Sequence, residues 1–183
     1  MKYFRAPAFA ALLLLASCGG SPHRPDGSAK KGPPPFYCPQ VAVLEQAQTL
    51  TLFLPGRADV AARITTAQIS PPSGACQFHK DKNSVVVTIN TAFLADNGPA
   101  NNNAPLALPW FAAFTTADNV LVKSDYTQHL SFDGNNSTTS ATAKPVRIEL
   151  PNDPENENTQ ILIGFEETPD QLAYAAAHPS AVP

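Results

Sequence analysis

Apolar and polar residues alternate along most of the chain beyond residue 36, which is the pattern of strands with one buried face. Four apolar residues share one face of the clearest run: Val85, Val87, Ile89 and Phe93. A second run alternates over residues 106–114 and contains Trp110, the candidate for an aromatic residue at the centre of a core. The period of two therefore predicts a protein made mainly of β-strands.

Other runs predict further strands at residues 41–44, 49–54, 60–69, 75–78, 120–132, 146–150 and 161–165. In the 60–69 run, Ile64 and Ile69 fall on opposite faces, so this strand needs either a bulge near Thr65 and Thr66 or a less buried second face. In the 120–132 run, the apolar residues line one face: Val120, Val122, Tyr126, Leu130 and Phe132.

Turn-forming residues separate the strands, and a helix signal follows the last one. Thr168-Pro169-Asp170-Gln171 places Thr at an N-cap, Pro at the first helical position and Gln three residues after the cap. We expect a short helix there, through about Ala177. About eight short strands with no alternation of strands and helices predict an all-β fold, an antiparallel β-sandwich with a short C-terminal helix. The sandwich is immunoglobulin-like or fibronectin-like in a loose sense, and a small closed barrel is the competing architecture.

The first 18 residues resemble the export signal of a bacterial lipoprotein. Lys2 and Arg5 precede an apolar run over residues 6–16 that is too short to span a bilayer. Leu15-Ala16-Ser17-Cys18 resembles a lipobox. By that resemblance, lipoprotein signal peptidase cuts before Cys18, whose sulfur carries a diacylglyceryl group. An ordinary secretory signal that is cleaved nearby is the alternative.

The chain accordingly divides into four segments. These are a signal peptide (1–17), a lipidated Pro/Gly-rich tether (18–36), a β-sandwich domain (37–168), and a short helix with a tail (169–183). The run Pro33-Pro34-Pro35 favours polyproline II structure near the end of the tether. Gly19 rather than Asp follows the lipidated cysteine, which favours the outer membrane over the inner membrane.

Charge and cysteine content limit the classes of partner. Without residues 1–17 the chain keeps 10 basic and 15 acidic side chains, a net charge of about −5. No basic patch is visible in the sequence, so we expect no nucleic-acid partner, and the lipid must supply the attachment to the membrane. Cys38 and Cys76 remain once Cys18 is assigned to lipid, and an oxidising compartment lets them form a disulfide. Two free buried thiols or a reactive cysteine are the alternatives.

Candidate chemical groups are few. The most suggestive segment is residues 152–158, whose alternating carboxylates suit calcium, although the EF-hand spacing and glycine are missing. A solvated acidic loop between two strands is the competing interpretation. The histidines are dispersed and form no zinc pattern: His23, His79, His129 and His178. Because no nucleophile or phosphate-binding motif stands out either, we expect no enzymatic activity, no metal site and no cofactor.

Several short motifs run through the mature chain. They are Cys38-Pro39-x-Val41-x-Val43-Leu44, Leu50-Thr51-x-Phe53-x-Pro55-Gly56 with Asp59, Cys76-x-Phe78, the segment from Phe93 to Gly98-Pro99, Ile161-Leu162-Ile163-Gly164-Phe165, Thr168-Pro169 and Leu172-Ala173-Tyr174. Together they resemble a family of alphaproteobacterial outer-membrane lipoproteins of unassigned role. The motifs are turns, strand faces, a cysteine pair and a capped helix. The resemblance therefore implies fold and location, and it transfers no catalytic residue.

The expected function is that of an outer-membrane-anchored lipoprotein on the periplasmic face. Its domain is expected to be a non-enzymatic interaction or structural module, accessory to a complex of the cell envelope. The expected partners are the membrane, through the lipid on Cys18, and a protein of the cell envelope. The alternative is a periplasmic-face binding module for a small ligand or glycan, which would use the polar loop at residues 97–105 and neighbouring loops at the strand ends.

Overall fold

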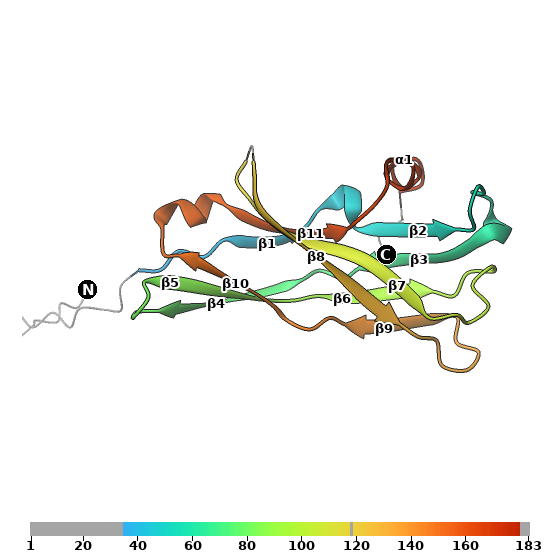
Figure 1. Ribbon diagram of the computed structural model, residues 1–183, viewed down its shortest axis with the longest axis horizontal. Helices are drawn as coiled ribbons and strands as arrows, with labels where there is room; N and C mark the ends of the chain where they lie inside the picture. The colour runs from blue at the N-terminus through green and yellow to red at the C-terminus, as the bar shows by residue number, and fades with distance from the viewer. Residues whose placement is uncertain (1–34, 118, 180–183) are drawn as a thin grey trace, which may run out of the picture. The chain divides into compact units, whose positions relative to one another are not determined.

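Strands dominate the computed structural model, which describes residues 35–117 and 119–179 and packs its strands in two layers (Figure 1). In chain order the described strands are β1 (Gln40–Val43), β2 (Thr49–Phe53), β3 (Arg63–Ile69), β4 (Ser73–His79), β5 (Ser84–Asn90), β6 (Ala92–Asp96), β7 (Leu106–Thr115), β8 (Val120–Leu130), β9 (Thr138–Thr142), β10 (Val146–Pro151) and β11 (Gln160–Phe165). The described helices are three 3-10 turns, η1 (Glu45–Ala47), η2 (Val60–Ala62) and η3 (Pro154–Asn158), and the α-helix α1 (Pro169–Ala177). The predicted all-β sandwich with a short C-terminal helix is confirmed.

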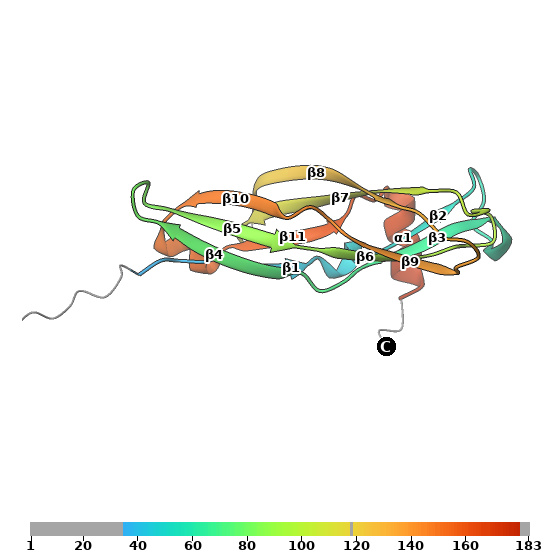
Figure 2. The same cartoon turned by 90° about the horizontal axis from the view of Figure 1, so that it is seen from below.

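The first layer is one four-stranded sheet with the order β1-β11-β7-β8. The second layer has two parts, with the orders β10-β5-β4 and β2-β3-β6-β9. Figure 2 shows that the parts are continuous, since β5 runs on into β6 and β9 leads into β10. Each order is open at both ends, so the described strands form a sandwich and not the competing closed barrel.

Prolines separate the two parts of the second layer. Pro71-Pro72 lies between β3 and β4, and Pro145 lies between β9 and β10. Proline has no backbone N–H, so it cannot donate a hydrogen bond to a neighbouring strand. A single bond bridges the gap on one side, where Ser70 N–H donates to the Ala92 carbonyl at 2.9 Å. The strands of the two parts therefore stay side by side, although the backbone hydrogen bonds between them are interrupted at the prolines.

The core between the layers is centred on aromatic side chains. The Phe93 ring of β6 lies 5.3 Å from the Trp110 ring of β7 and 5.8 Å from the Phe165 ring of β11, measured between ring centroids. Trp110 also stacks on Tyr126 of β8, with ring centroids 4.6 Å apart. Because Phe93, Trp110 and Phe165 are each at most 2 % exposed, they join the two layers away from water. The predicted central position of Trp110 is confirmed.

The alternating runs are buried where the sequence pattern predicts burial. The buried members include Val85, Val87, Ile89, Leu106, Leu108, Ala112, Phe114, Ile161 and Ile163. Each lies on the face of its strand that meets the opposite layer, because successive side chains of a strand point to opposite sides. Period-two alternation thus identified the core-facing positions of these strands.

Strand pairing differs from the prediction in two respects. β1 pairs with β11 in parallel, so the sandwich is not antiparallel throughout. A parallel pair needs a long connection, and here the rest of the domain forms it. The irregularity of β3 falls at Ile64, which has no partner where Leu52 pairs with Thr65 and Phe53 with Arg63. The bulge expected near Thr65 and Thr66 is therefore present one residue away, at Ile64.

The face of β8 that the sequence predicts to be apolar and buried is in fact buried only toward the C-terminal end of the strand. Val120 and Val122 are 62 % and 56 % exposed, whereas Leu130 is buried. Figure 1 shows why, because the tip of the β7–β8 hairpin projects away from both layers. Alternation is present in the sequence, but burial also requires an opposite layer.

The C-terminal helix begins as the sequence predicts. Thr168 Oγ1 accepts a hydrogen bond from Gln171 N–H at 3.3 Å, and Gln171 Oε1 accepts one from Thr168 N–H at 2.8 Å. These two bonds close a capping box. Tyr174 of α1 packs against Phe53, with ring centroids 5.0 Å apart, so α1 covers β2.

Gly98 offers a test of how tightly the 97–105 loop lies on β3. Its N–H donates to the Ile64 carbonyl at 2.8 Å, and a Cβ added at Gly98 would stand 2.6 Å from that carbonyl oxygen. We expect Gly98→Ala to lower the free energy of unfolding by about 2 kcal/mol or more, because backbone must shift to admit the methyl group. Urea denaturation followed by circular dichroism measures the change.

Gly134→Ala is the matched control. Its added Cβ would meet nothing within 4 Å, and its cost arises only from a φ of +58°, about 1 kcal/mol. Equal stability losses for the two variants would contradict the close packing of the loop on β3.

Candidate functional site

Residues 35–38, where the described part of the domain begins, are held by contacts that we call the N-terminal clamp. Its covalent part is a disulfide between Cys38 and Cys76, with Cα atoms 6.1 Å apart. Cys38 precedes β1 of the first layer and Cys76 lies in β4 of the second, so the bond joins the layers at one edge. The structure thus brings together the cysteine pair that the sequence predicts. The third predicted site residue, Cys18, lies outside the described residues.

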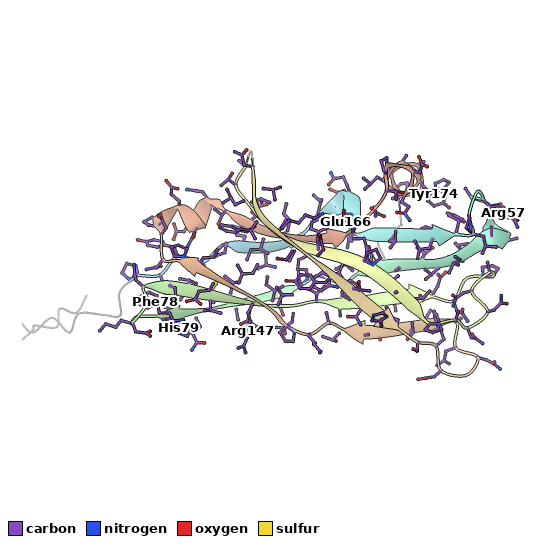
Figure 3. All side chains as sticks on the ribbon, in the orientation of Figure 1. Arg57, Phe78, His79, Arg147, Glu166 and Tyr174 are labelled. Carbon is purple, nitrogen blue, oxygen red and sulfur yellow. A yellow bond between two sulfur atoms is a disulfide. The ribbon has the colours of Figure 1, made fainter. Side chains whose placement is uncertain are left out.

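Asn152, which follows β10, supplies the polar part of the N-terminal clamp. Its Oδ1 accepts a hydrogen bond from Tyr37 N–H at 3.1 Å, and its Nδ2 donates to the Pro35 carbonyl at 3.3 Å. Phe36 stacks on Phe78, with ring centroids 6.3 Å apart, and Figure 3 shows Phe78 at the end of the second layer. Asn152 is the first residue of the segment predicted to suit calcium, and its role in the N-terminal clamp could not be predicted, since a side-chain bond to distant backbone leaves no periodic signal in the sequence.

The loop at residues 97–105, expected to bind a ligand under the alternative function, is bonded largely to itself. Asn101 is 4 % exposed, and its Nδ2 donates to Asn97 Oδ1 at 2.8 Å and to the Ala104 carbonyl at 3.0 Å. Asn97 Nδ2 in turn donates to Asn103 Oδ1. Asn102 and Asn103 have φ values of +52° and +60°, a region that Asn tolerates better than most residues. These amides hold the shape of the loop.

The acidic segment at residues 152–158 forms the turn η3 instead of an open loop. Asp153 Oδ1 accepts a hydrogen bond from Glu155 N–H at 2.9 Å. Asn156 is buried, and its Nδ2 donates to the Pro151 carbonyl at 2.7 Å. Among the residues that the structure describes, no three His, Cys, Asp or Glu side chains gather as they would around a metal ion. The geometry therefore gives the calcium interpretation no support.

The described histidines lie on separate elements. His79 ends β4, His129 belongs to β8, and His178 caps the C-terminus of α1 with its Nδ1 2.9 Å from the Tyr174 carbonyl oxygen. His23 lies outside the described residues. The structure thus does not assemble the described histidines into one site.

Glu167 is a buried carboxylate that no pattern in the sequence predicts. It lies between β11 and α1, and neither of its carboxylate oxygens has a hydrogen-bond partner or contact with solvent. Burial removes water from the carboxylate and raises the pKa of Glu167 from 4.5 to about 7. No sequence signal distinguishes it from its exposed neighbour Glu166, which forms an ion pair with Lys123.

Comparison with known proteins identifies no relative of this chain. No protein-family model, no curated protein and no solved structure matches it. The likeness to outer-membrane lipoproteins therefore stays a prediction from short motifs. Within residues 35–117 and 119–179, no helix has the length and apolar character needed to cross a bilayer.

Removing the disulfide tests the energetic weight of the N-terminal clamp. We expect the double variant Cys38→Ser with Cys76→Ser to lose about 2–4 kcal/mol of unfolding free energy, because the bond constrains the unfolded chain. Asn152→Ala, which removes two hydrogen bonds and leaves the disulfide, should lose only about 1–2 kcal/mol. Urea midpoints measure both. An unchanged midpoint in the double variant would show that the disulfide does not stabilise the domain.

Glu167 makes stability depend on pH. Below pH 4.5 the carboxyl is mainly protonated in both the folded and the unfolded chain, so its ionisation has little effect on stability. As the pH rises to about 7, the unfolded state ionises first and stability falls. Glu167→Gln keeps the group neutral, so we expect a gain on the order of 1 kcal/mol at pH 8 and almost none at pH 4.

Thermal unfolding at both pH values measures this difference. Glu166→Gln serves as the matched control, because the neighbouring carboxylate is exposed and paired with Lys123. A gain for Glu167→Gln of the same size at pH 4 and pH 8 would rule out a buried, ionising carboxyl as its cause.

Proposed function

We propose that this protein is a lipid-anchored, non-enzymatic interaction module of the bacterial outer membrane, held on the periplasmic face and accessory to an envelope complex. The observation that carries the proposal is the N-terminal clamp. The described chain begins at a segment that leads into β1 of the first layer and is fixed to the second layer by the Cys38–Cys76 disulfide and by Asn152. If a tether holds the domain from its N-terminal side, a fixed N-terminal segment would transmit that hold directly to the folded strands.

The cysteine count supports the same proposal. The chain contains three cysteines, and two of them form the disulfide. The third, Cys18, follows Leu15-Ala16-Ser17, where a lipoprotein signal would place the lipidated residue. Two or three acyl chains on one cysteine would hold the domain at a membrane, whereas one chain binds only marginally.

The alternative, a binding module for a small ligand or glycan, is less well supported. It depends on the polar loop at residues 97–105, whose amide groups would have to contact the ligand. The side chains of Asn97 and Asn101 already form hydrogen bonds within that loop. Binding would therefore require these bonds to be exchanged for new ones.

Metabolic labelling with an alkyne analogue of palmitate tests the anchor. We expect the wild-type chain to incorporate the label and to fractionate with membranes. Cys18→Ser should lose both properties, because the thioether-linked lipid cannot form on a serine hydroxyl. In-gel fluorescence of the labelled protein, with quantification in the membrane and soluble fractions, measures the result.

The double variant Cys38→Ser with Cys76→Ser is the control, and it should keep the label because its cysteines are structural. An unlabelled wild-type chain, or a Cys18→Ser chain that still carries label, would refute lipidation at Cys18.

A further inference from the structure

The outer edge of β8 pairs with no other strand in the part of the chain that the structure describes. β8 ends the order β1-β11-β7-β8, and its 11 residues make it the longest described strand. It begins with three exposed apolar side chains, because Val120, Leu121 and Val122 are 62 %, 52 % and 56 % exposed. Soluble β-proteins normally protect a long edge of this kind.

The other described edges are short, covered or interrupted. β1 has 4 residues, and the disulfide ties its start to β4. β4 contains Gly74 and is tied to Cys38 by the disulfide. β2 is covered by α1, β9 has 5 residues, and β10 ends at Pro151. β8 contains neither proline nor glycine, so nothing in its backbone prevents a further strand from pairing with it.

Pro109 of β7 determines which backbone groups of β8 point outward. Its carbonyl accepts a hydrogen bond from Glu166 N–H at 3.0 Å on the β11 side, and proline has no N–H. Pro109 and its partner Thr127 therefore exchange no backbone hydrogen bond, and Thr127 directs its own N–H and C=O away from β7. Because hydrogen-bonded and non-bonded pairs alternate in an antiparallel ladder, Lys123 and Asp125 also present their backbone groups at the free edge.

Lys123 and Asp125 make this edge complementary to itself. When two copies of β8 run antiparallel with Ser124 opposite Ser124, Lys123 of each copy lies opposite Asp125 of the other. Both residues have outward backbone groups, so they form hydrogen-bonded pairs, and opposite charges directly across a ladder stabilise it. A register centred on Lys123 or on Asp125 instead places like charges opposite each other, which is destabilising.

The other face of β8 fits the same register. Val122 of each copy lies opposite Tyr126 of the other, and pairs of an aromatic and a β-branched residue stabilise sheets. Tyr126 is already held in place by its stacking on Trp110. When two identical β8 edges pair with each other, neither remains free for a third copy. The assembly therefore closes as a dimer and does not grow into a fibre.

We infer that β8 is a docking strand and that its occupant is β8 of a second copy of this chain. The two strands pair antiparallel about Ser124, which joins the two first-layer sheets into one continuous sheet. The inference deepens the proposed interaction role and rests on it, because anchoring in one membrane would concentrate the copies.

Two cysteine substitutions in the full chain, expressed in cells, test this register. Ser124→Cys places the two thiols on the symmetry axis at a non-hydrogen-bonded pair, where Cα atoms lie about 4.5 Å apart, within the range of a disulfide. Thr127→Cys is the matched control on the same exposed strand, because its two copies would lie about 20 Å apart along the strands. After mild oxidation we expect about tenfold more covalent dimer from Ser124→Cys on non-reducing gels.

Adding Asp125→Lys to Ser124→Cys places lysine opposite lysine, and we expect the dimer yield to fall several-fold. Equal cross-linking of the two cysteine variants, no dimer from Ser124→Cys, or its capture by a different protein would each overturn the inference. Palmitate labelling of the same samples reports on the anchor separately, so a missing anchor and missing strand pairing give different results.

Discussion

Phe93 packs between Trp110 and Phe165 at the centre of the sandwich, and the two layers depend on this contact and the apolar residues around it. Each layer buries one face, so its strands must present apolar side chains at every second position. Burying one large apolar side chain contributes about 1.5–3 kcal/mol, and aromatic pairs add about 0.5–1.5 kcal/mol. The same contact fixes strand register, since a slip by one residue would turn the buried side chains toward water.

Two packed layers leave strand edges at their rim, and the described edges differ in how they are protected from pairing with another strand. The Cys38–Cys76 disulfide closes the rim where the described chain begins, and α1 covers β2 through Tyr174. Among the described strands, only β8 combines such length with an exposed apolar start. One part of the rim is therefore locked by a covalent bond, whereas the edge of β8 is left open.

The sequence predicted what depends on local pattern and missed what depends on tertiary arrangement. Strand alternation, the capping box at Thr168 and the cysteine pair are local or compositional, and the structure contains all three. The parallel pairing of β1 with β11 joins segments from opposite ends of the domain, and no periodicity encodes it. The exposure of Val122 depends on the absence of an opposite layer, and the role of Asn152 depends on backbone brought close by the fold.

The central claim is that a disulfide-locked β-domain is displayed on a lipid anchor. Intact-mass measurement of the mature chain purified from the envelope, before and after reduction, tests both parts of that claim together. The account predicts a chain that begins at Cys18, carries acyl lipid on that residue, and gains hydrogen only when the Cys38–Cys76 bond is reduced. A chain that begins at another residue and carries no lipid, or one in which Cys38 and Cys76 are free thiols before reduction, would contradict it.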